Sequence, residues 1–170
     1  MIHEEKRIKW IEDHIEDIDN CNWEKFYMEL DDADESSEWG DLYYTVGCIT
    51  DILLQAGINP LDTTTTIYPN MFVCSQIEHI DISHITMLGR SAFYNSKLNE
   101  CKIPEGIKDI PMECFESCFQ LKWIEIPKSV VRIASDAFPL DNADLILKVH
   151  KGSFASKWVK DTVFQWEYIE

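Results

Sequence analysis

Three cysteines in the second half of the chain are of the residue type that could hold a metal ion. Cys114 and Cys118 are four positions apart, and Cys101 precedes them. Cysteine thiolates at short spacing suit tetrahedral Zn²⁺, which would make the chain a zinc-stabilised binding protein. A structural zinc site needs further ligands, however, and no matching second pair accompanies Cys114 and Cys118. We therefore expect buried thiols here, and no metal or cofactor.

Other motifs of catalysis are missing from the sequence. His79, His84 and His150 lack the paired spacing of a metal-binding helix, so we expect them to be surface histidines. There is no serine nucleophile motif, no phosphate-binding glycine loop and no dinucleotide fingerprint. Acidic residues are abundant, but on helices they form a solvated face more often than a catalytic pair. The sequence therefore predicts that the protein is not an enzyme.

Cysteine content and hydropathy indicate the cellular compartment in which the protein is expected. Three disulfides could form among six cysteines, which are Cys21, Cys48, Cys74, Cys101, Cys114 and Cys118. The N-terminus MIHEEKRIKW lacks the apolar segment of a secretion signal, so we expect free thiols in a reducing, cytoplasmic environment. Because no stretch approaches the roughly 18 uninterrupted apolar residues of a membrane span, we also expect no membrane partner.

The charge of the chain disfavours one class of partner. Its 15 basic and 31 acidic residues give a formal net charge of −16. Nucleic-acid phosphates repel such a chain, so we expect no direct binding to DNA or RNA. Residues 1–42 hold fifteen acidic and four basic residues, so −11 of the charge lies in the N-terminal segment. An acidic surface is complementary to a basic one, which favours a protein partner with a basic surface.

Apolar spacing within this acidic segment predicts a first helix that ends near Asn20. A three-four-three spacing places on one stripe the residues Ile8, Ile11, Ile15 and Ile18. The other faces of this helix carry Glu12, Asp13, Glu16 and Asp17. The pattern is that of an amphipathic helix with an acidic outer surface.

Two more helices are predicted before residue 60. Asn22 is placed to cap a helix whose apolar positions are Trp23, Phe26, Tyr27 and Leu30. The acidic run DDADESSE then breaks the pattern. Ser36 or Ser37 can cap a third helix, which passes through Leu42, Val46, Ile49 and Leu53 and is stopped by Gly57 and Pro60. Gly40 and Gly47 weaken this helix by about 1 kcal/mol each, so it must depend on packing.

From Ile67 onward, the sequence repeats at an interval of about 21 to 24 residues, as leucine-rich repeats do. The turns align in columns of equivalent residues, which are Ile80, Cys101 and Ile124; Ile82, Ile103 and Ile126; Leu88, Ile110 and Ile133; Ala92, Cys114 and Ala137; Phe93, Phe115 and Phe138; and Leu98 with Leu121. Phe72 and Ile77 belong to an incomplete earlier turn. One turn is too small to bury its own apolar face, so stacking like on like makes a shared core.

These repeats closely resemble the BspA-like leucine-rich-repeat family. The residues that carry the resemblance are Ile103-Pro104, Ile110, Cys114-Phe115, Cys118, Leu121, Ile124 and Ile126-Pro127. The tail, with Lys151-Gly152-Ser153, looks like the closing helix and strand of such arrays. The segment from Trp23 to Leu61 is similar to the helical cap on short arrays in phages and prophages of Gram-positive bacteria. Departures from the family pattern are Ser83 in place of proline, and Ser96 and Asp141 where Cys118 stands.

Together, the patterns predict an α+β fold in which a three-helix N-terminal cap precedes a short leucine-rich-repeat solenoid. We expect an acidic helical cap over residues 1–62 and the solenoid, with its C-terminal capping helix and strand, over residues 63–170. A cap is needed because an uncovered terminal repeat would expose its apolar interior.

Partner binding is expected on two surfaces. If the columns point inward, alternate strand residues point outward, in one row of His79, Glu100, Trp123 and Ile146 and a second of Asp81, Lys102, Glu125 and Lys148. Trp123 could be an exposed anchor for a partner or could pack on a ladder neighbour. The second surface is the acidic cap, with Glu12, Asp13, Glu16, Asp17, Asp31, Asp32, Asp34 and Glu35.

Three functions follow as hypotheses. The first is a phage-type acidic inhibitor, anti-CRISPR-like, that sequesters a basic nucleic-acid-handling host protein such as a Cas nuclease in the host cytoplasm. The second is a cell-surface adhesion or recognition module, which many longer arrays of the family resemble and which predicts a secretion signal or anchor. The third is the zinc-stabilised binding protein. The oligomeric state does not follow from the sequence.

Overall fold

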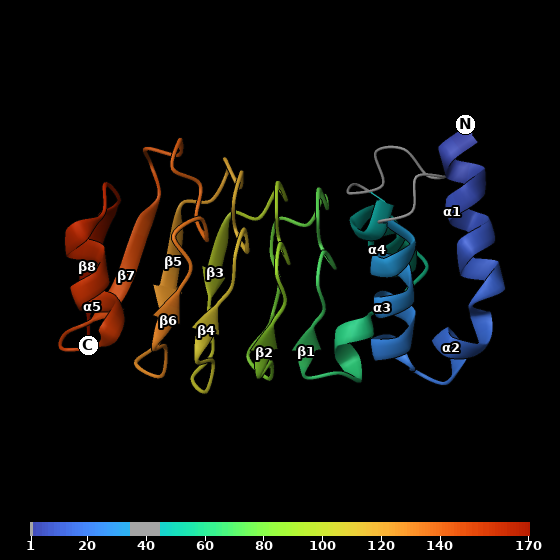
Figure 1. The fold of residues 1–170 in the computed structure, drawn as a ribbon, viewed down its shortest axis with the longest axis horizontal. Coiled ribbons are helices and arrows are strands. Elements are labelled where there is room, and N and C mark those ends of the chain that lie inside the picture. The colour runs from blue at the N-terminus through green and yellow to red at the C-terminus, as the bar shows by residue number, and fades with distance from the viewer. Residues whose placement is uncertain (1, 35–44) are drawn as a thin grey trace.

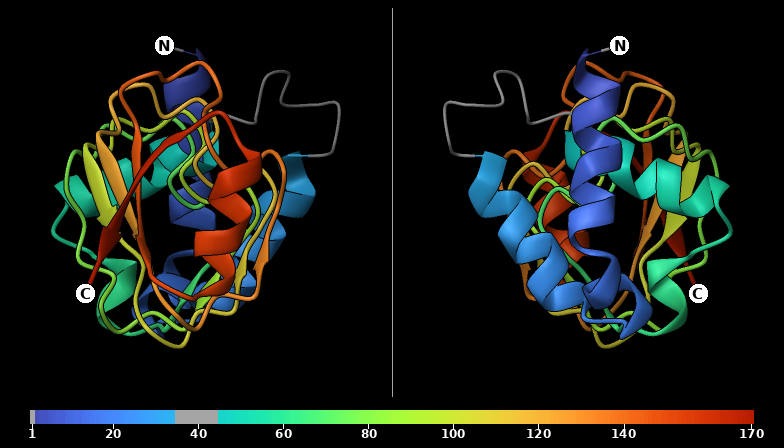
Figure 2. Two further views of the ribbon diagram at one scale, coloured as in Figure 1. Left: turned by 90° about the vertical axis from the view of Figure 1, so that its left-hand side faces the viewer. Right: turned by 90° about the vertical axis from the view of Figure 1, so that its right-hand side faces the viewer.

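The structure is a computed structural model that describes residues 2–34 and 45–170. Helices gather at the N-terminal end, and a stack of turns carries the chain away from them to the C-terminal end (Figure 1). Seen end on, the turns lie one behind another around a common interior, with α1 crossing one end and α5 lying at the other (Figure 2). The predicted α+β solenoid with an N-terminal helical cap is confirmed.

The cap begins with a helix that is divided in two, where the spacing of isoleucines predicted one. α1 spans Ile2–Asp13 and α2 spans Ile15–Asp19. They separate at His14, whose backbone leaves the helical region and whose ring bonds back to the carbonyl of Trp10 at 2.8 Å. The break also changes the predicted stripe, because Ile18 is buried whereas Ile8 and Ile15 are about half exposed.

The next two helices form the packed part of the cap. α3 spans Trp23–Asp34, and its predicted apolar residues Trp23, Phe26, Tyr27 and Leu30 are all buried. α4 spans Thr45–Gln55, whereas the predicted caps at Ser36 or Ser37 lie outside the described residues. Gly57 ends α4 as predicted, with a φ of 80°. Its N–H bonds to the carbonyl of Leu54 and the next N–H bonds to that of Leu53, which is a Schellman motif.

The turns of the solenoid pair through short parallel strands. The main sheet contains β3 (Glu100–Lys102), β5 (Trp123–Ile126), β7 (Ile146–His150) and β8 (Gln165–Ile169), in that order. Two smaller sheets join β1 (Thr66–Ile67) to β2 (Met87–Leu88) and β4 (Asp109–Ile110) to β6 (Arg132–Ile133). The 3₁₀ helix η2 (Pro60–Asp62) precedes the turns, and α5 (Phe154–Trp158) and η3 (Val159–Asp161) lie between β7 and β8.

The predicted columns are the core. Cys101 pairs with Ile124, and Ile110 pairs with Ile133. The phenylalanines stack with nearly parallel rings, at centroid distances of 5.3 Å from Phe72 to Phe93, 5.3 Å from Phe93 to Phe115 and 5.9 Å from Phe115 to Phe138. All four rings are buried, so each turn is stabilised mainly by the turns on either side of it.

The corners of the turns use left-handed backbone at residues other than glycine. Ser91 and Glu113 have positive φ at equivalent places in successive turns, and so do Asn95 and Ser117. This left-handed conformation costs an L-residue about 1 kcal/mol or more. These residues adopt it because the surrounding turn holds their backbone in place. These corners cannot be predicted from the sequence repeat, because none of the four residues is glycine.

Cap and solenoid share one core. α4 lies so close to the first turn that a β-carbon at Gly47 would meet the carbonyl oxygen of Val73 at 1.7 Å. Tyr27 of α3 stacks on Tyr68 with a centroid distance of 5.6 Å, and its hydroxyl bonds to Thr50 of α4 at 2.9 Å. The buried hydrophobic cluster runs without a break from the cap to the last turn. The division at residues 62 and 63 stays a prediction.

Candidate partner-binding surfaces

The main sheet presents an outward surface, which we call the strand face: Glu100, Lys102, Trp123, Glu125, Ile146 and Lys148. Its register is that of the two predicted rows, because Trp123 pairs with Glu100 and Ile146, and Glu125 pairs with Lys102 and Lys148. The residues between them point into the core. His79 and Asp81 precede β3 in a turn without strand pairing, so they lie beside the strand face rather than within its sheet.

Charges on the strand face are paired either with one another or with residues beside it. Lys102 lies 2.8 Å from the carboxylate of Glu125, and Lys148 lies 3.7 Å from that of Glu167 on β8. His79 lies 3.9 Å from Glu100. Glu167 was not among the predicted site residues, although it follows Lys148 by 19 positions and its place in the row could have been inferred from the predicted closing strand. Exposed pairs of this kind contribute little stability, and a partner would have to displace them.

Trp123 packs on a neighbour in the ladder. The ammonium of Lys148 lies 4.3 Å from the centre of its ring, which is a cation–π contact, and the indole is partly buried. The tryptophan is thus held in place by the next turn. A role for Trp123 in binding stays a prediction, and it would use the part of the ring that Lys148 leaves exposed.

Two hollows flank the first complete turn. One has a volume of about 290 Å³ and the other about 210 Å³, and both are lined by Ile80 and Asp81. The N–H of Ser83 donates to the Asp81 carboxylate at 2.9 Å, and this bond holds the pKa of Asp81 below its usual range. Asp81 is therefore an ionised, exposed group beside two small hollows that are lined by both apolar and polar side chains.

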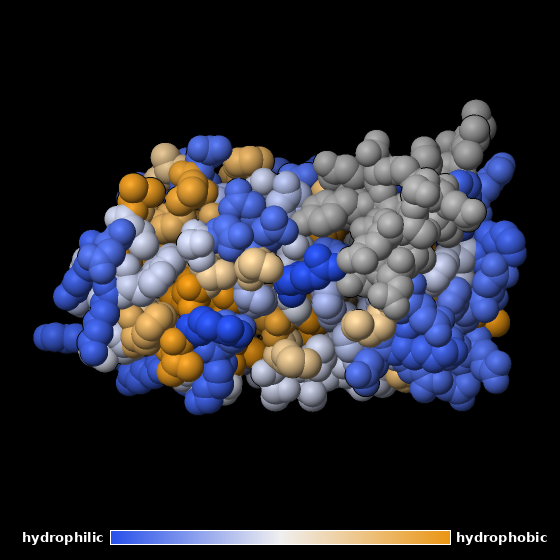
Figure 3. Space-filling view, viewed as in Figure 1, coloured by the Kyte–Doolittle hydropathy of each residue, from blue (hydrophilic) through white to orange (hydrophobic). Residues whose placement is uncertain are grey.

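The cap supplies the more strongly acidic surface. Among the described residues of α1 to α3, the exposed acidic side chains are Glu5, Glu12, Asp13, Glu16, Asp19, Glu24 and Glu29, against exposed Lys6, Lys9 and Lys25. Figure 3 shows a hydrophilic surface over the cap and apolar side chains gathered over the repeats. Asp13 is engaged by Lys9 at 2.8 Å, whereas Glu12 and Glu16 form no ion pair within the described part of the chain.

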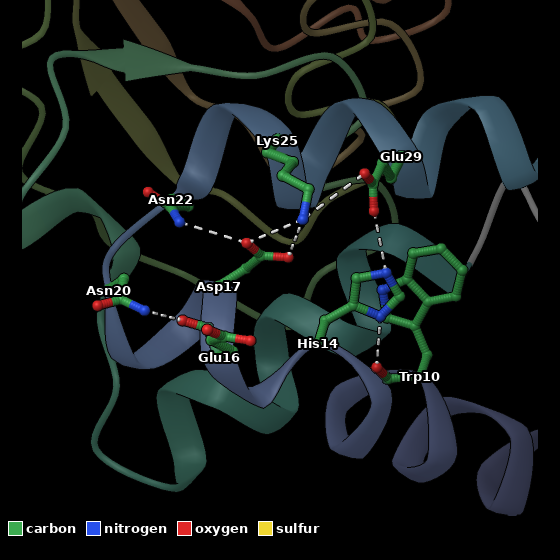
Figure 4. Close-up of polar contacts among 8 residues, drawn as sticks. All are labelled: Trp10, His14, Glu16, Asp17, Asn20, Asn22, Lys25 and Glu29. Carbon is green, nitrogen blue, oxygen red and sulfur yellow. Dashed lines mark hydrogen bonds and ion pairs between the residues drawn. The ribbon is translucent and has the colours of Figure 1, made fainter.

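Asp17 is a structural residue of the cap. Its side chain is 10% exposed and accepts hydrogen bonds from Lys25 at 2.9 Å and from Asn22 at 3.3 Å (Figure 4). The bond from Lys25 holds the pKa of Asp17 below its usual range. Lys25 also approaches Glu29, which in turn contacts the ring of His14 at 3.2 Å. These contacts join α2 to α3, so Asp17 is less accessible to a partner than its position in the sequence suggests.

The other predicted acidic residues lie at or beyond the end of α3. Asp31, Asp32 and Asp34 belong to its last turns, and Glu35 lies outside the described residues. Their part in binding, like that of the strand face and of Glu12, Asp13 and Glu16, stays a prediction.

The cysteines singled out for metal chemistry are core residues. Cys101 and Cys114 are buried in the predicted columns, and Cys118 is buried too, where it donates to the carbonyl of Phe93 at 2.9 Å. Burial raises the pKa of all three thiols, to about 11 for Cys118. All six cysteines are free thiols. In residues 2–34 and 45–170, no group of three potential metal ligands comes together.

In the part of the chain that the structure describes, no helix is both long and apolar enough to cross a membrane.

Comparison with known proteins identifies the repeats. The model of the BspA type leucine rich repeat region matches residues 54–145 in six copies. Neither the curated proteins nor the solved structures gave a match. Solenoids of this kind are typically scaffolds that bind proteins rather than enzymes, because they present an extended surface without a catalytic constellation. The matched residues make up more than half of the chain, and the protein belongs to the BspA-type leucine-rich-repeat family.

Proposed function

We propose that the protein is an acidic inhibitor that binds the basic surface of a nucleic-acid-handling protein, with a Cas nuclease as the specific candidate. The observation that carries the proposal is the concentration of negative charge at one end of the sequence, where residues 1–42 contribute −11 of the net −16. Proteins that handle DNA or RNA carry large basic surfaces, and a dense acidic surface is complementary to them.

Two features of the structure favour the cap over the strand face as the binding surface. Charges on the strand face already neutralise one another, as in the pair of Lys102 and Glu125. Glu12 and Glu16, in contrast, are exposed on α1 and α2. A rigid solenoid packed against α4 holds these helices in place through the shared core, so little order has to be gained on binding. The site of action would be the cytoplasm of the host cell.

The test measures inhibition and its dependence on charge. Purified chain is titrated into a guide-loaded Cas nuclease with labelled duplex DNA, and cleavage and DNA binding are followed at low and high salt. We expect inhibition that weakens as salt rises, because screening acts on exposed charges. A triple variant, Glu12→Gln with Glu16→Gln and Glu24→Gln, should lose most of the inhibition.

The matched control replaces glutamates by glutamines on the strand face instead of the cap. Glu100→Gln with Glu125→Gln removes two carboxylates from the strand face and should leave inhibition nearly unchanged. Inhibition that ignores salt, or that survives the cap variant and fails with the strand-face variant, would contradict the charge-based proposal. If no basic nucleic-acid-handling protein binds, the adhesion hypothesis becomes the better one.

A further inference from the structure

The last strand carries two aromatic residues at positions that are core elsewhere. Trp166 pairs with Leu147 and Tyr168 pairs with Val149, so both continue columns that point into the solenoid. Leu147 and Val149 are fully buried, but Trp166 is 37% exposed and Tyr168 is 46% exposed. Their rings touch edge to face at 5.2 Å. The core-facing side of β8 therefore presents apolar surface that its neighbours do not cover.

The backbone edge of β8 is also unprotected. β8 is the outer strand of the main sheet, and within the described residues only β7 pairs with it. At the opposite edge, the preceding turn runs alongside the start of β3, where the N–H of Asn99 donates to the carbonyl of Glu78 at 3.0 Å. Natural sheets protect free edges with charged side chains, above all lysine, or with proline. The sequence QWEYI of β8 has no lysine or proline, and its one charged residue, Glu167, is paired with Lys148 of β7. This edge can accept another strand.

Charge favours contact between two copies at this end of the molecule. Residues 146–170 carry four lysines and three acidic residues, whereas residues 1–42 carry a net charge of −11. Two copies that meet through their C-terminal turns keep their acidic caps far apart. Contact at this end therefore meets less electrostatic repulsion than contact through the acidic N-terminal segments of a chain with a net charge of −16.

The opposite end of the solenoid cannot serve as the complement. α3 and α4 already cover it, with Gly47 of α4 against Val73 and Tyr27 of α3 stacked on Tyr68. Head-to-tail stacking into a filament is thereby blocked, and the surface that matches β8 is β8 of another copy. A contact of a surface with itself has two-fold symmetry, which closes after two copies.

We propose that the protein forms a dimer in which β8 pairs antiparallel with β8 of a second copy and joins the two four-stranded sheets into one. Trp166 and Tyr168 of each copy cover those of the other. The strand faces of both copies then form one continuous surface, and the two acidic caps lie at opposite ends.

Sedimentation of the full chain over a concentration series tests the association. The wild type should show a monomer–dimer equilibrium. Tyr168→Lys places a charge at the half-exposed position that the second copy would cover and should raise the dissociation constant about tenfold or more, with an unchanged circular dichroism spectrum. The matched control is Val131→Lys, at a residue that is 62% exposed on another part of the repeats, and it should leave the equilibrium unchanged.

Disulfide trapping tests the geometry. In a Cys21→Ser background, Glu167→Cys at the middle of β8 should give a covalent dimer when a copper–phenanthroline oxidant takes the two electrons and two protons of the thiols. Val131→Cys in the same background should not. A wild type that stays monomeric throughout, equal effects of Tyr168→Lys and Val131→Lys, or no enrichment of the Glu167→Cys dimer over the control would overturn the proposal.

Discussion

The backbone of Gly47 in α4 lies against the carbonyl group of Val73 in the first turn, without room for a side chain between them. An added β-carbon would lie 1.7 Å from the carbonyl oxygen and 2.6 Å from the carbonyl carbon. Because both partners are backbone, neither can move away alone. This contact sets how closely the helical cap approaches the repeats.

Gly47→Ala should therefore destabilise the protein by about 3 kcal/mol or more, since α4 must shift away from the core that it shares with the repeats. Urea unfolding followed by tryptophan fluorescence measures the change. Gly57→Ala is the comparison, because at Gly57 a β-carbon would meet nothing within 4 Å and only its φ of 80° is unfavourable. We expect a loss of about 1 kcal/mol there. Equal losses for the two variants would contradict the close packing.

Acid should weaken the cap through Asp17. Its hydrogen bond from Lys25 lowers the pKa of Asp17 in the folded protein, so the stabilisation is fully present above the unfolded pKa of about 3.9 and is lost as the pH falls through the folded value. Asp17→Asn should flatten the fall in the urea midpoint between about pH 5 and pH 3. Asp19→Asn, at an exposed residue of the same helix, should keep the wild-type slope. A wild-type slope in Asp17→Asn would show that the pair with Lys25 does not stabilise the cap.

The columns predict opposite sensitivities for two adjacent core residues. Cys114 stands where the neighbouring turns carry Ala92 and Ala137, so Cys114→Ala should cost about 1 kcal/mol or less. Phe115 is stacked between Phe93 and Phe138, and Phe115→Ala should cost about 3–5 kcal/mol. Thermal unfolding by calorimetry measures both. A large loss with Cys114→Ala would mean that the thiol has a role beyond filling space.

One corner of the solenoid should gain stability from glycine. Ser117 has a φ of 59°, which a side chain disfavours. Ser117→Gly should raise the free energy of unfolding by about 0.5–1 kcal/mol, and Ser117→Val should lower it by about 1–2 kcal/mol, because a β-branched residue fits this conformation least. Ser135→Gly, at an exposed position of the next turn, is the control and should not stabilise. Destabilisation by Ser117→Gly would show that the serine side chain matters more than the backbone strain.

The repeats could be predicted because equivalent residues recur periodically in the sequence. Residues equivalent to Ile124, Phe115 and Leu121 recur every 21 to 23 residues, and like residues stack on like, so the core, the register and the outward rows follow from alignment of the sequence with itself. The cap was less predictable. Its helices follow from apolar spacing, but the break at His14 depends on a ring that bonds back to Trp10, and the partial exposure of Ile8 depends on what α1 packs against.

The contacts between side chains on the surface could not be predicted from the repeat pattern of the sequence. The pairing of Lys148 with both Trp123 and Glu167 joins three turns, and the burial of Asp17 depends on the position of Lys25 on another helix. Such contacts are set by tertiary placement, whereas the sequence shows only that charged residues alternate with apolar ones. The left-handed corners at Ser91 and Ser117 also carry no sequence signal, because serine is common in any turn.

The ladder of phenylalanines makes the length of the molecule adjustable in whole steps. Phe93 and Phe115 each stack between two rings of the ladder, and Phe138, the last of them, stacks on Phe115 and packs against Trp158 and Phe164. Duplication of one repeat between them would insert a turn whose two faces match those already present. The strand face would grow by the spacing of one strand, about 4.8 Å, while the cap and β8 kept their structures. Duplication of repeats can therefore fit the length of the strand face to the size of a partner, while the core keeps the same packing.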